Sequence, residues 1–326
     1  MSAKLSTAPV SVVIPSLDNF ELLERNLPAL LREFGRREVG DELVIVDDSG
    51  TGALKPWAAE ALRGMPARLL VRKSNGGFAP ALTSGIEAAS HPLIFSMNSD
   101  VRVRPGFLDP LIEALGPTSE AGATNPVFAV APRVLLNGEQ QQIESFSKCI
   151  LLDGLMTTRL SVAHGQQLDA PSEPAMIPFA IGGTALFRRA DFESLGGFDE
   201  LFAPFYFEDN DLCWRAWRRG SASVYVPESV VEHHHKGTIG SLLSAKRRRA
   251  AIERGELLFN WKHLDQEHLH RHMASLYRRA LDAWVTDDRD ALIWLQLALD
   301  SMKEAFSSRA FQHEQSTADV LETLNS

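Results

Sequence analysis

The sequence predicts an α/β fold in which helices flank a mostly parallel sheet. Short apolar runs alternate with segments of helical periodicity through residues 10–100, and each run ends in polar or glycine-containing turn residues. Alternating strands and helices favour a doubly wound sheet, whose ligands bind beyond the carboxyl ends of the strands. After residue 240 the pattern becomes helical and charged. We therefore expect one α/β domain over residues 1–240 and a C-terminal helical extension over residues 241–326.

Four apolar runs account for the expected parallel strands. Helical spacing from Leu22 to Phe34 separates the first two runs, and helical spacing from Ala81 to Ala89 precedes the fourth. The runs, each with the polar residues that follow it, are Val10–Ile14 with Pro15 and Ser16, Leu43–Val46 with Asp47 and Asp48, Arg68–Val71 with Asn75 and Gly76, and Leu93–Met97 with Asn98 and Asp100. Polar residues at several strand ends indicate a binding site at one edge of the sheet, although turns are rich in the same residues.

The middle of the chain has a weaker pattern. Val127–Leu136 is expected to form a pair of strands, and Leu160–Ala175 has the composition of a loop. Phe179–Phe187 is expected to be a strand whose glycines, Gly182 and Gly183, allow another group to approach the backbone closely.

Composition limits the possible classes of function. The chain has 326 residues and a net charge of −9, which does not favour nucleic-acid binding. Two cysteines cannot form a disulfide framework, no signal-peptide pattern begins the chain, and no apolar run approaches the roughly 18 residues that span a bilayer. We expect a cytoplasmic protein. The basic run Lys246–Arg249 is interpreted as a solvated helix face, with contact to anionic lipids at the inner face of the membrane as the alternative.

The C-terminal region contains aromatic and histidine residues for which we expect structural roles. Trp261, Trp284 and Trp294 are expected to anchor its helices. The histidines between His263 and His272 have mixed spacing and are expected at the surface.

An acidic cluster follows an aromatic run in the sequence. Glu208, Asp209 and Asp211 fall within four residues, after Phe205–Phe207 and at the start of a segment of helical periodicity. Aromatic neighbours exclude water, which raises the pKa of a carboxylate and suits it to accept a proton. Acids at this position are also typical of helix caps.

Two other positions suggest a site for a divalent cation. Asp100 ends a strand, and Mg²⁺ and Mn²⁺ are often held by one or two carboxylates together with substrate phosphates. His233 follows the apolar stretch Val230–Val231, and a histidine nitrogen is a ligand suited to Mn²⁺. Side chains alternate along an extended chain, so at most His233 and His235 share a face. Glu232 is an alternative ligand, and a polar turn and an exposed loop are the alternatives to a metal site.

Taken in order, these motifs resemble the GT-A glycosyltransferases of family 2, a group that includes rhamnosyltransferases. The dinucleotide-binding and phosphate-loop glycine motifs are absent from the sequence. The resemblance covers residues 10–240. It rests on the strand ends above and on three later segments, Gly182–Arg189, Gly196–Glu200 and Phe207–Leu212.

The resemblance implies a role for each matching residue. Asp209 would be the catalytic base, with Glu208 nearer the acceptor and Asp211 as the helix cap. The nucleotide would bind to Pro15, Ser16, Asp47, Asp48, Asn75, Gly76 and Asn98, the metal to Asp100 and His233, and the donor or acceptor sugar to Gly182, Gly183, Thr184 and Trp214. Stricter members of the family have an acid where Asn98 stands here.

These roles imply a metal-dependent, inverting transferase with Mn²⁺ or Mg²⁺ as cofactor. It would move a hexosyl or deoxyhexosyl group from a nucleotide-diphosphate sugar to a glycan or lipid-linked acceptor in polysaccharide synthesis. Two alternatives remain. One is a catalytically silent nucleotide-sugar or glycan-binding module. The other is a nucleotidyltransferase, which is disfavoured because no glycine-rich, lysine-containing loop lies near the N-terminus. The C-terminal helices would pack on the transferase domain or form a homo-oligomer.

Overall fold

The first half of the central sheet is parallel and forms as the sequence predicts. A computed structural model describes residues 8–117, 126–139, 142–152, 154–160, 170–234, 245–287, 292–309 and 315–325. The strands and helices of this half are β1 (Val10–Ser16), α1 (Phe20–Arg37), β2 (Glu42–Asp47), α2 (Lys55–Ala61), β3 (Ala67–Val71), α3 (Phe78–Ala88) and β4 (Leu93–Met97). β1 pairs in parallel with both β2 and β4, and β2 pairs in parallel with β3. β1, β2 and β4 are almost wholly buried, as expected for apolar strands in a covered parallel sheet.

The second half of the sheet is mixed. Its elements are β5 (Val101–Val103), α4 (Leu108–Leu115), β6 (Val127–Leu136), β9 (Ala175–Ile177), β10 (Thr184–Arg188), α5 (Arg189–Ser194), the 3₁₀ turn η2 (Glu200–Phe202), α6 (Glu208–Trp217) and β11 (Ala222–His233). The strand order is β3-β2-β1-β4-β10-β6-β11-β5, and β9 pairs with β11. β10 runs antiparallel to β4 and β6, whereas β11 is parallel to β6.

Three sequence expectations change in this half. Residues 127–136 form one ten-residue strand, β6, instead of a strand pair. β10 begins at Thr184, so Gly182 and Gly183 precede the strand. The expected loop from Leu160 to Ala175 falls largely on residues outside the described ranges, and its last residue begins β9.

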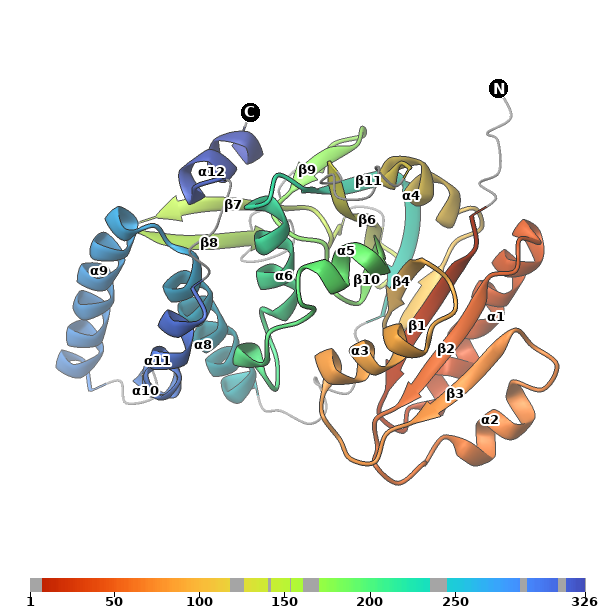
Figure 1. Ribbon diagram of the computed structural model, residues 1–326. Coiled ribbons are helices and arrows are strands. Elements are labelled where there is room, and N and C mark those ends of the chain that lie inside the picture. The colour runs from red at the N-terminus through yellow and green to blue at the C-terminus, as the bar shows by residue number, and fades with distance from the viewer. Residues whose placement is uncertain are drawn as a thin grey trace.

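Helices cover both faces of the sheet and make three layers (Figure 1). Apolar side chains of α1, α2 and α4 pack against one face. Side chains of α3, α5 and α6 pack against the other face. The sheet therefore places its strand ends, and the first residues of α6, at the edges of a three-layer sandwich.

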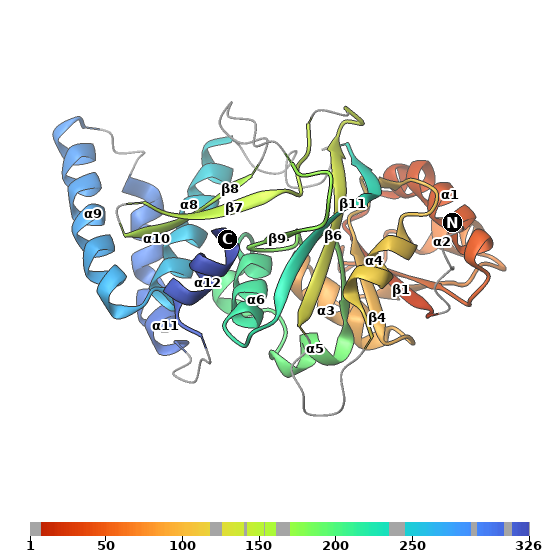
Figure 2. The same ribbon diagram turned by 90° about the horizontal axis from the view of Figure 1, so that it is seen from above.

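The C-terminal helices form a separate core at the opposite end of the molecule from β1–β3 (Figures 1 and 2). The elements of this end are the hairpin β7 (Ser147–Leu152) and β8 (Leu155–Leu160), then α8 (Ala245–His263), α9 (Gln266–Val285), α10 (Ile293–Asp300), α11 (Met302–Ser307) and α12 (Thr317–Asn325). Trp214 and Trp217 of α6 share this core with Leu258 and Trp261 of α8. The C-terminal extension thus packs directly against α6.

The tryptophans and histidines of the C-terminal helices differ in their exposure to solvent. Trp261 is fully buried, whereas Trp284 is 73% exposed and anchors nothing in the described chain. The side chain of Trp294 is outside the described residues. His263 and His272 are both 2% exposed, which corrects their expected surface position.

The basic run lies in α8, where Arg247 and Arg249 are exposed and Arg248 is half-buried. Arg249 there has an 82% exposed side chain and pairs with Glu253 one turn along the helix. Within the described residues, no helix is both long and apolar enough to cross a membrane.

Candidate active site

The ends of β1 and β2 form the first part of the site. Their register places Pro15 beside Val46 and Ser16 beside Asp47. The carboxylate of Asp47 is fully buried and accepts hydrogen bonds from the backbone amides of Ser49 and Leu54, each at 2.9 Å. Asp47 therefore shapes the loop after β2. The hydroxyl of Ser16 is buried without a hydrogen-bond partner among the described residues, which is what a group awaiting a ligand would show.

Asp48 organises the glycine turn before α3. Its carboxylate accepts from the backbone amides of Gly76 at 3.1 Å and Gly77 at 2.8 Å, and it pairs with Arg72 at 2.5 Å. A Cβ at Gly76 would overlap the Arg72 guanidinium, so a larger residue there would displace Arg72 from Asp48. Asn75 stays exposed on the same turn. Sequence reasoning missed Arg72, because one arginine after a strand carries no specific signal.

The glycine pair before β10 connects two parts of the site. The backbone amide of Asn98 donates to the carbonyl of Gly183 at 2.9 Å. The backbone amide of Gly182 donates to Oδ2 of Asp209 at 2.9 Å. A Cβ at Gly183 would overlap the Asn98 side chain, which explains the close approach expected for this pair. Thr184 is 2% exposed and pairs with Met97 in the sheet.

Asp209 and Glu208 lie in the first turn of α6, as expected. Oδ1 of Asp209 also accepts from the backbone amide of Asn210 at 2.8 Å. Burial raises the pKa of Asp209, although its hydrogen bonds to Gly182 and Asn210 oppose the rise. Glu208 is 8% exposed, and its Oε2 has no hydrogen-bond partner within the described chain. Burial, reinforced by the charge of Asp209, raises the pKa of Glu208 to about 8.

Asp211 has a different role from the expected helix cap. The residue at the N-cap position is Phe207, in the left-handed conformation, and Asp211 lies inside the helix. Its fully buried carboxylate pairs with Arg215 at 2.8 Å, Lys262 at 2.6 Å and His263 at 2.7 Å. Burial opposes ionisation, but these partners hold the pKa of Asp211 well below its ordinary value.

The expected metal ligands lie next to each other. Nε2 of His233 is 3.2 Å from Oδ1 of Asp100, and the opposite ring nitrogen, Nδ1, is 2.6 Å from Oε2 of Glu144. Burial alone would lower the pKa of His233, but the two carboxylates raise it to about 10. Glu144 comes from the middle region with a weak pattern, so sequence reasoning missed it.

Asp100 and His233 fit a divalent cation as a pair of ligands. Within the described ranges, no group of three or more His, Cys, Asp or Glu is arranged to hold a metal ion. Mg²⁺ and Mn²⁺ use few protein ligands when phosphates complete their coordination. The 3.2 Å between Oδ1 of Asp100 and Nε2 of His233 is close to the spacing of about 3 Å between adjacent ligands at bond lengths of about 2.1 Å. Glu232 instead pairs with Arg104 at 3.0 Å, and His235 is outside the described residues.

Trp214 does not lie where a sugar could reach it. Its side chain is 1% exposed, and its ring packs edge-on against Phe259 of α8, with ring centroids 5.7 Å apart. Trp214 belongs to the C-terminal core, and we leave it out of the site.

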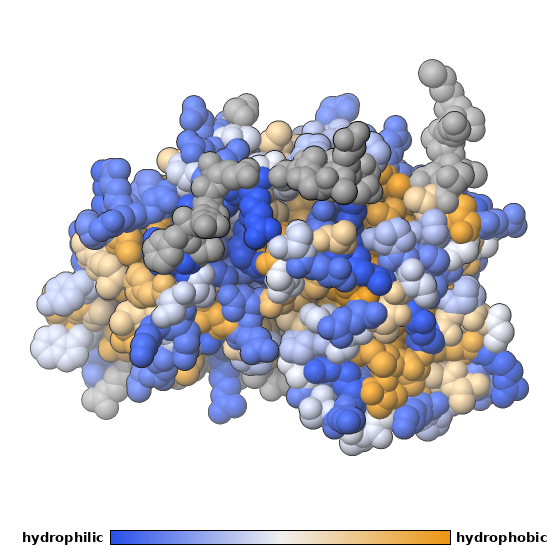
Figure 3. Space-filling view, viewed as in Figure 1, coloured by the Kyte–Doolittle hydropathy of each residue, from blue (hydrophilic) through white to orange (hydrophobic). Residues whose placement is uncertain are grey.

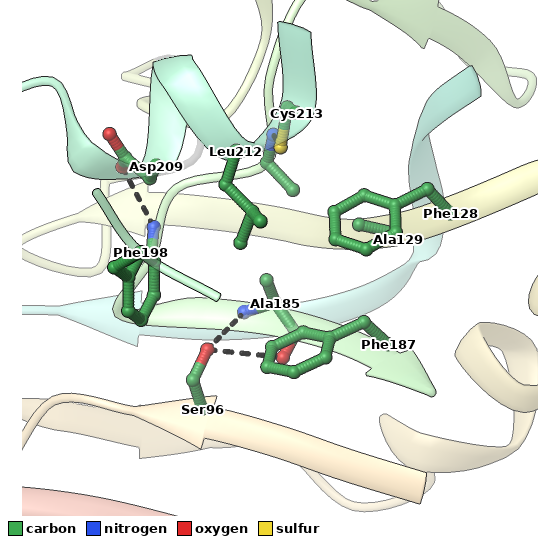
Figure 4. Close-up of a pocket in the computed structure, with 11 residues that line it drawn as sticks. Ser96, Phe128, Ala129, Ala185, Phe187, Phe198, Asp209, Leu212 and Cys213 are labelled. Atoms are coloured by element: carbon green, nitrogen blue, oxygen red, sulfur yellow. Dashed lines mark hydrogen bonds between the residues drawn. The ribbon is translucent and has the colours of Figure 1, made fainter. Parts of the chain in front are cut away.

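A small apolar cavity lies beneath α6, with Asp209 at one side (Figure 4). In Figure 4 the Asp209 carboxylate is turned toward the backbone amide of Gly182, away from the rings of Phe128 and Phe187. The cavity has room for at most about one water molecule, so it cannot hold a sugar. Its apolar lining instead keeps water from one side of the Asp209 carboxylate.

A three-layer sandwich, with polar strand ends, a glycine turn and paired acids at the edge of its central sheet, is the architecture of the GT-A transferases of nucleotide-linked groups. The family described as Glycosyl transferase family 2 matches residues 11–196, which is more than half of the chain, and the chain belongs to that family.

Two curated relatives come from Mycobacterium tuberculosis. N-acetylglucosaminyl-diphospho-decaprenol L-rhamnosyltransferase is 29% identical over 211 residues, which cover 60% of this chain and 68% of the relative. Pre-mycofactocin glycosyltransferase is 26% identical over 247 residues, which cover 73% of this chain and 45% of the relative. The chain thus spans less than half the length of the second relative.

Solved structures confirm the GT-A fold. GalNAc-T7 with UDP, GalNAc and Mn²⁺ superposes with a TM-score of 0.62 at 17% identity, covering 93% of this chain and 55% of that one. The mannosyltransferase PcManGT from Pyrobaculum calidifontis, in complex with GDP-Man and Mn²⁺, has a TM-score of 0.52 at 15% identity and covers 95% of this chain and 90% of that one.

Proposed function

We propose that this chain is an inverting glycosyltransferase that moves a sugar from a nucleotide-diphosphate donor to a hydroxyl of a lipid-linked or glycan acceptor. Family membership and the name of the mycobacterial rhamnosyltransferase support this choice of acceptor class. A role in cell-surface polysaccharide synthesis and a hexosyl or deoxyhexosyl donor belong to the same proposal.

One observation carries the proposal. Gly183 binds the backbone of Asn98 and Gly182 binds the carboxylate of Asp209, so two consecutive residues connect the strand end that leads to Asp100 with the proposed base. An inverting displacement needs these two functions close together, because the leaving diphosphate and the attacking hydroxyl lie on opposite sides of one carbon atom.

The residues of the chain take the following parts in the reaction. Ser16 and Asn75 line the nucleotide pocket, while Asp47 and Asp48 hold its loops in shape. One carboxylate oxygen of Asp209 accepts the proton of the acceptor hydroxyl as the hydroxyl oxygen attacks the anomeric carbon. Glu208, which its raised pKa keeps protonated at neutral pH, can donate a hydrogen bond to the acceptor.

Asp100 and His233 would hold a divalent cation, Mn²⁺ or Mg²⁺. When bound, the cation neutralises negative charge that develops on the leaving diphosphate. The Mn²⁺ in the GalNAc-T7 and PcManGT structures supports this part of the proposal.

The C-terminal helices carry the surface that we propose for contact with a second copy of this chain. Tyr277, Trp284 and Val285 of α9 are each at least 70% exposed. Figure 3 shows pale and orange groups along this end of the molecule. Light scattering tests this surface, because Trp284→Ser should lower the mass of the oligomer, and an unchanged mass would contradict the proposal.

The function is tested with a panel of nucleotide sugars and Mn²⁺. The panel includes a nucleotide-linked rhamnose, UDP-GlcNAc and GDP-mannose. A donor that binds should raise the melting temperature, since ligand binding stabilises the folded state by mass action. Transfer of the selected sugar to N-acetylglucosaminyl-diphospho-decaprenol, with inversion read by NMR, would complete the test. Donor binding with no transfer to any acceptor would favour a silent binding module.

A further inference from the structure

Glu144 is held on a fixed backbone beside the proposed metal ligands. Its backbone amide donates to the carbonyl of Val134 at 2.9 Å, and Ile143 forms a β-bridge with Leu135. Its segment is therefore attached to β6, the strand that neighbours β11. His233 is paired with Leu136 of β6 in the same part of the sheet.

The Glu144 carboxylate and the Asp100 carboxylate contact opposite nitrogens of one imidazole ring. Glu144 contacts Nδ1 at 2.6 Å and Asp100 contacts Nε2 at 3.2 Å, with side-chain exposures of 16% for Glu144, 11% for His233 and 5% for Asp100. Both ring nitrogens of His233 contact carboxylates, so a cation bound beside Asp100 would take the place of the proton on Nε2, while Glu144 keeps the proton on Nδ1. The shorter contact is thus on the nitrogen that faces away from Asp100.

We infer that Glu144 is a positioning residue that fixes the ring orientation and tautomer of His233, so that Nε2 is the atom offered to the cation beside Asp100. The inference rests on the proposed function, because it assumes that Asp100 and His233 bind a metal ion. Glu144 would not itself be a ligand of the cation. Its acceptor oxygen limits His233 to one of its two tautomers.

A purely structural role for Glu144 predicts a different result. A structural contact would change the stability of the fold without changing metal affinity in the protein that remains folded. A positioning contact would weaken the metal site in a folded protein, and the loss would be graded by how well the replacement accepts the Nδ1 hydrogen. Carboxylates that orient a metal-bound histidine contribute about 10–100-fold in metal affinity.

The test measures Mn²⁺ affinity, alone and with UDP, by the EPR signal of free Mn²⁺. Wild type is compared with Glu144→Ala, Glu144→Gln, Asp100→Asn and the matched control Glu232→Gln. Glu232 neighbours His233 in sequence but pairs with Arg104, so the control removes an equal charge without touching the ring. Urea unfolding shows whether each variant is folded, and Glu144→Gln preserves the shape of the side chain if Glu144→Ala does not fold.

We expect Mn²⁺ affinity to fall about 10–100-fold in Glu144→Ala and less in Glu144→Gln, with Glu232→Gln unchanged. If wild type binds Mn²⁺ and both Glu144 variants bind it within twofold of wild type, the positioning role is overturned and the metal site stands. If wild type itself shows no Mn²⁺ binding under either condition, the proposed metal site is wrong and the positioning role fails with it.

Discussion

The ammonium of Lys262, in α8, lies 2.6 Å from Oδ1 of Asp211, in α6, two residues beyond the proposed base Asp209. The neighbouring His263 contacts the same oxygen at 2.7 Å. A Cβ at Gly255 of α8 would overlap Phe207, the residue that precedes α6. The C-terminal extension therefore holds the start of α6 through a buried ion cluster and a close helix contact, and it fixes the element on which the base sits.

Replacing Asp211 by Asn should destabilise the protein by about 3 kcal/mol, because the half-buried Arg215 and the buried Lys262 each lose a counter-charge, although Lys262 keeps Asp199 at 2.6 Å. Urea unfolding at pH 7 measures the change. Asp211 has a lowered pKa in the folded state, so its stabilisation is present above its ordinary pKa of 3.8 and is lost as the pH falls through its folded-state pKa. The difference in the free energy of unfolding between the variant and wild type should therefore become smaller below about pH 4.

Glu267→Gln is the matched control for Asp211. Glu267 pairs with Arg271 one turn along α9, and the two side chains are 76% and 67% exposed. An exposed pair of this kind contributes about 0–1 kcal/mol. Equal losses of stability in the two variants would contradict a bracing role for the Asp211 cluster.

Replacing Asp209 by Asn should lower kcat by about 10²–10⁴-fold, because the variant lacks the carboxylate that accepts the acceptor proton. The Asn side chain retains an oxygen that can accept the hydrogen bond from Gly182, so the fold should be preserved. Steady-state kinetics measure kcat, and thermal stabilisation by UDP with Mn²⁺ shows whether nucleotide binding is kept. Near-normal turnover in a folded variant would remove Asp209 from the role of base.

The sequence predicts the parallel half of the fold well, because its signals there are local. β1, β2 and β4 are apolar runs bounded by turn residues, and each lies where the pattern places it. The mixed half depends on pairings between distant segments. Residues 184–188 carry no local signal that β10 lies between β4 and β6. The strand order could therefore not be predicted from the sequence.

The candidate site shows the same division between local and long-range information. Asp209 and Glu208 lie in the first turn of α6 as predicted, because helix periodicity and an acidic first turn are local signals. Trp214 was predicted to contact a sugar, yet α8 buries it from a distance of more than forty residues in the chain. Glu144 and Lys262 were missed for the same reason, since only the folded chain brings them to their partners.

Replacing Glu208 by Gln should flatten the pH dependence of stability. Between its ordinary pKa of 4.5 and its folded-state pKa of about 8, the folded protein keeps a proton on Glu208 that the unfolded chain releases. The free energy of unfolding must therefore fall as the pH rises through this window. Gln carries no such proton. Urea unfolding measures the free energy of unfolding at pH 5.5 and at pH 8.5. Between these two values, the free energy of unfolding of wild type should fall by about 1–4 kcal/mol more than that of the variant, since each pKa unit corresponds to about 1.4 kcal/mol. Parallel pH profiles would show that Glu208 ionises normally.

Two glycine substitutions test whether the connection between Asn98 and Asp209 matters for activity. Gly183→Ala would push a methyl group into the amide of Asn98, so we expect a loss of about 1–3 kcal/mol in stability and at least about a tenfold loss in kcat/KM. Gly35 lies inside α1 with no heavy atom within 4 Å of an added Cβ. Gly35→Ala should therefore gain about 0.5–1 kcal/mol from helix propensity and leave kcat/KM unchanged. Urea unfolding and steady-state kinetics on both variants separate the two effects. If Gly183→Ala loses stability but keeps full kcat/KM, the glycine pair has only a structural role in the sheet. The close connection between the cation site and the base would then not be needed for transfer.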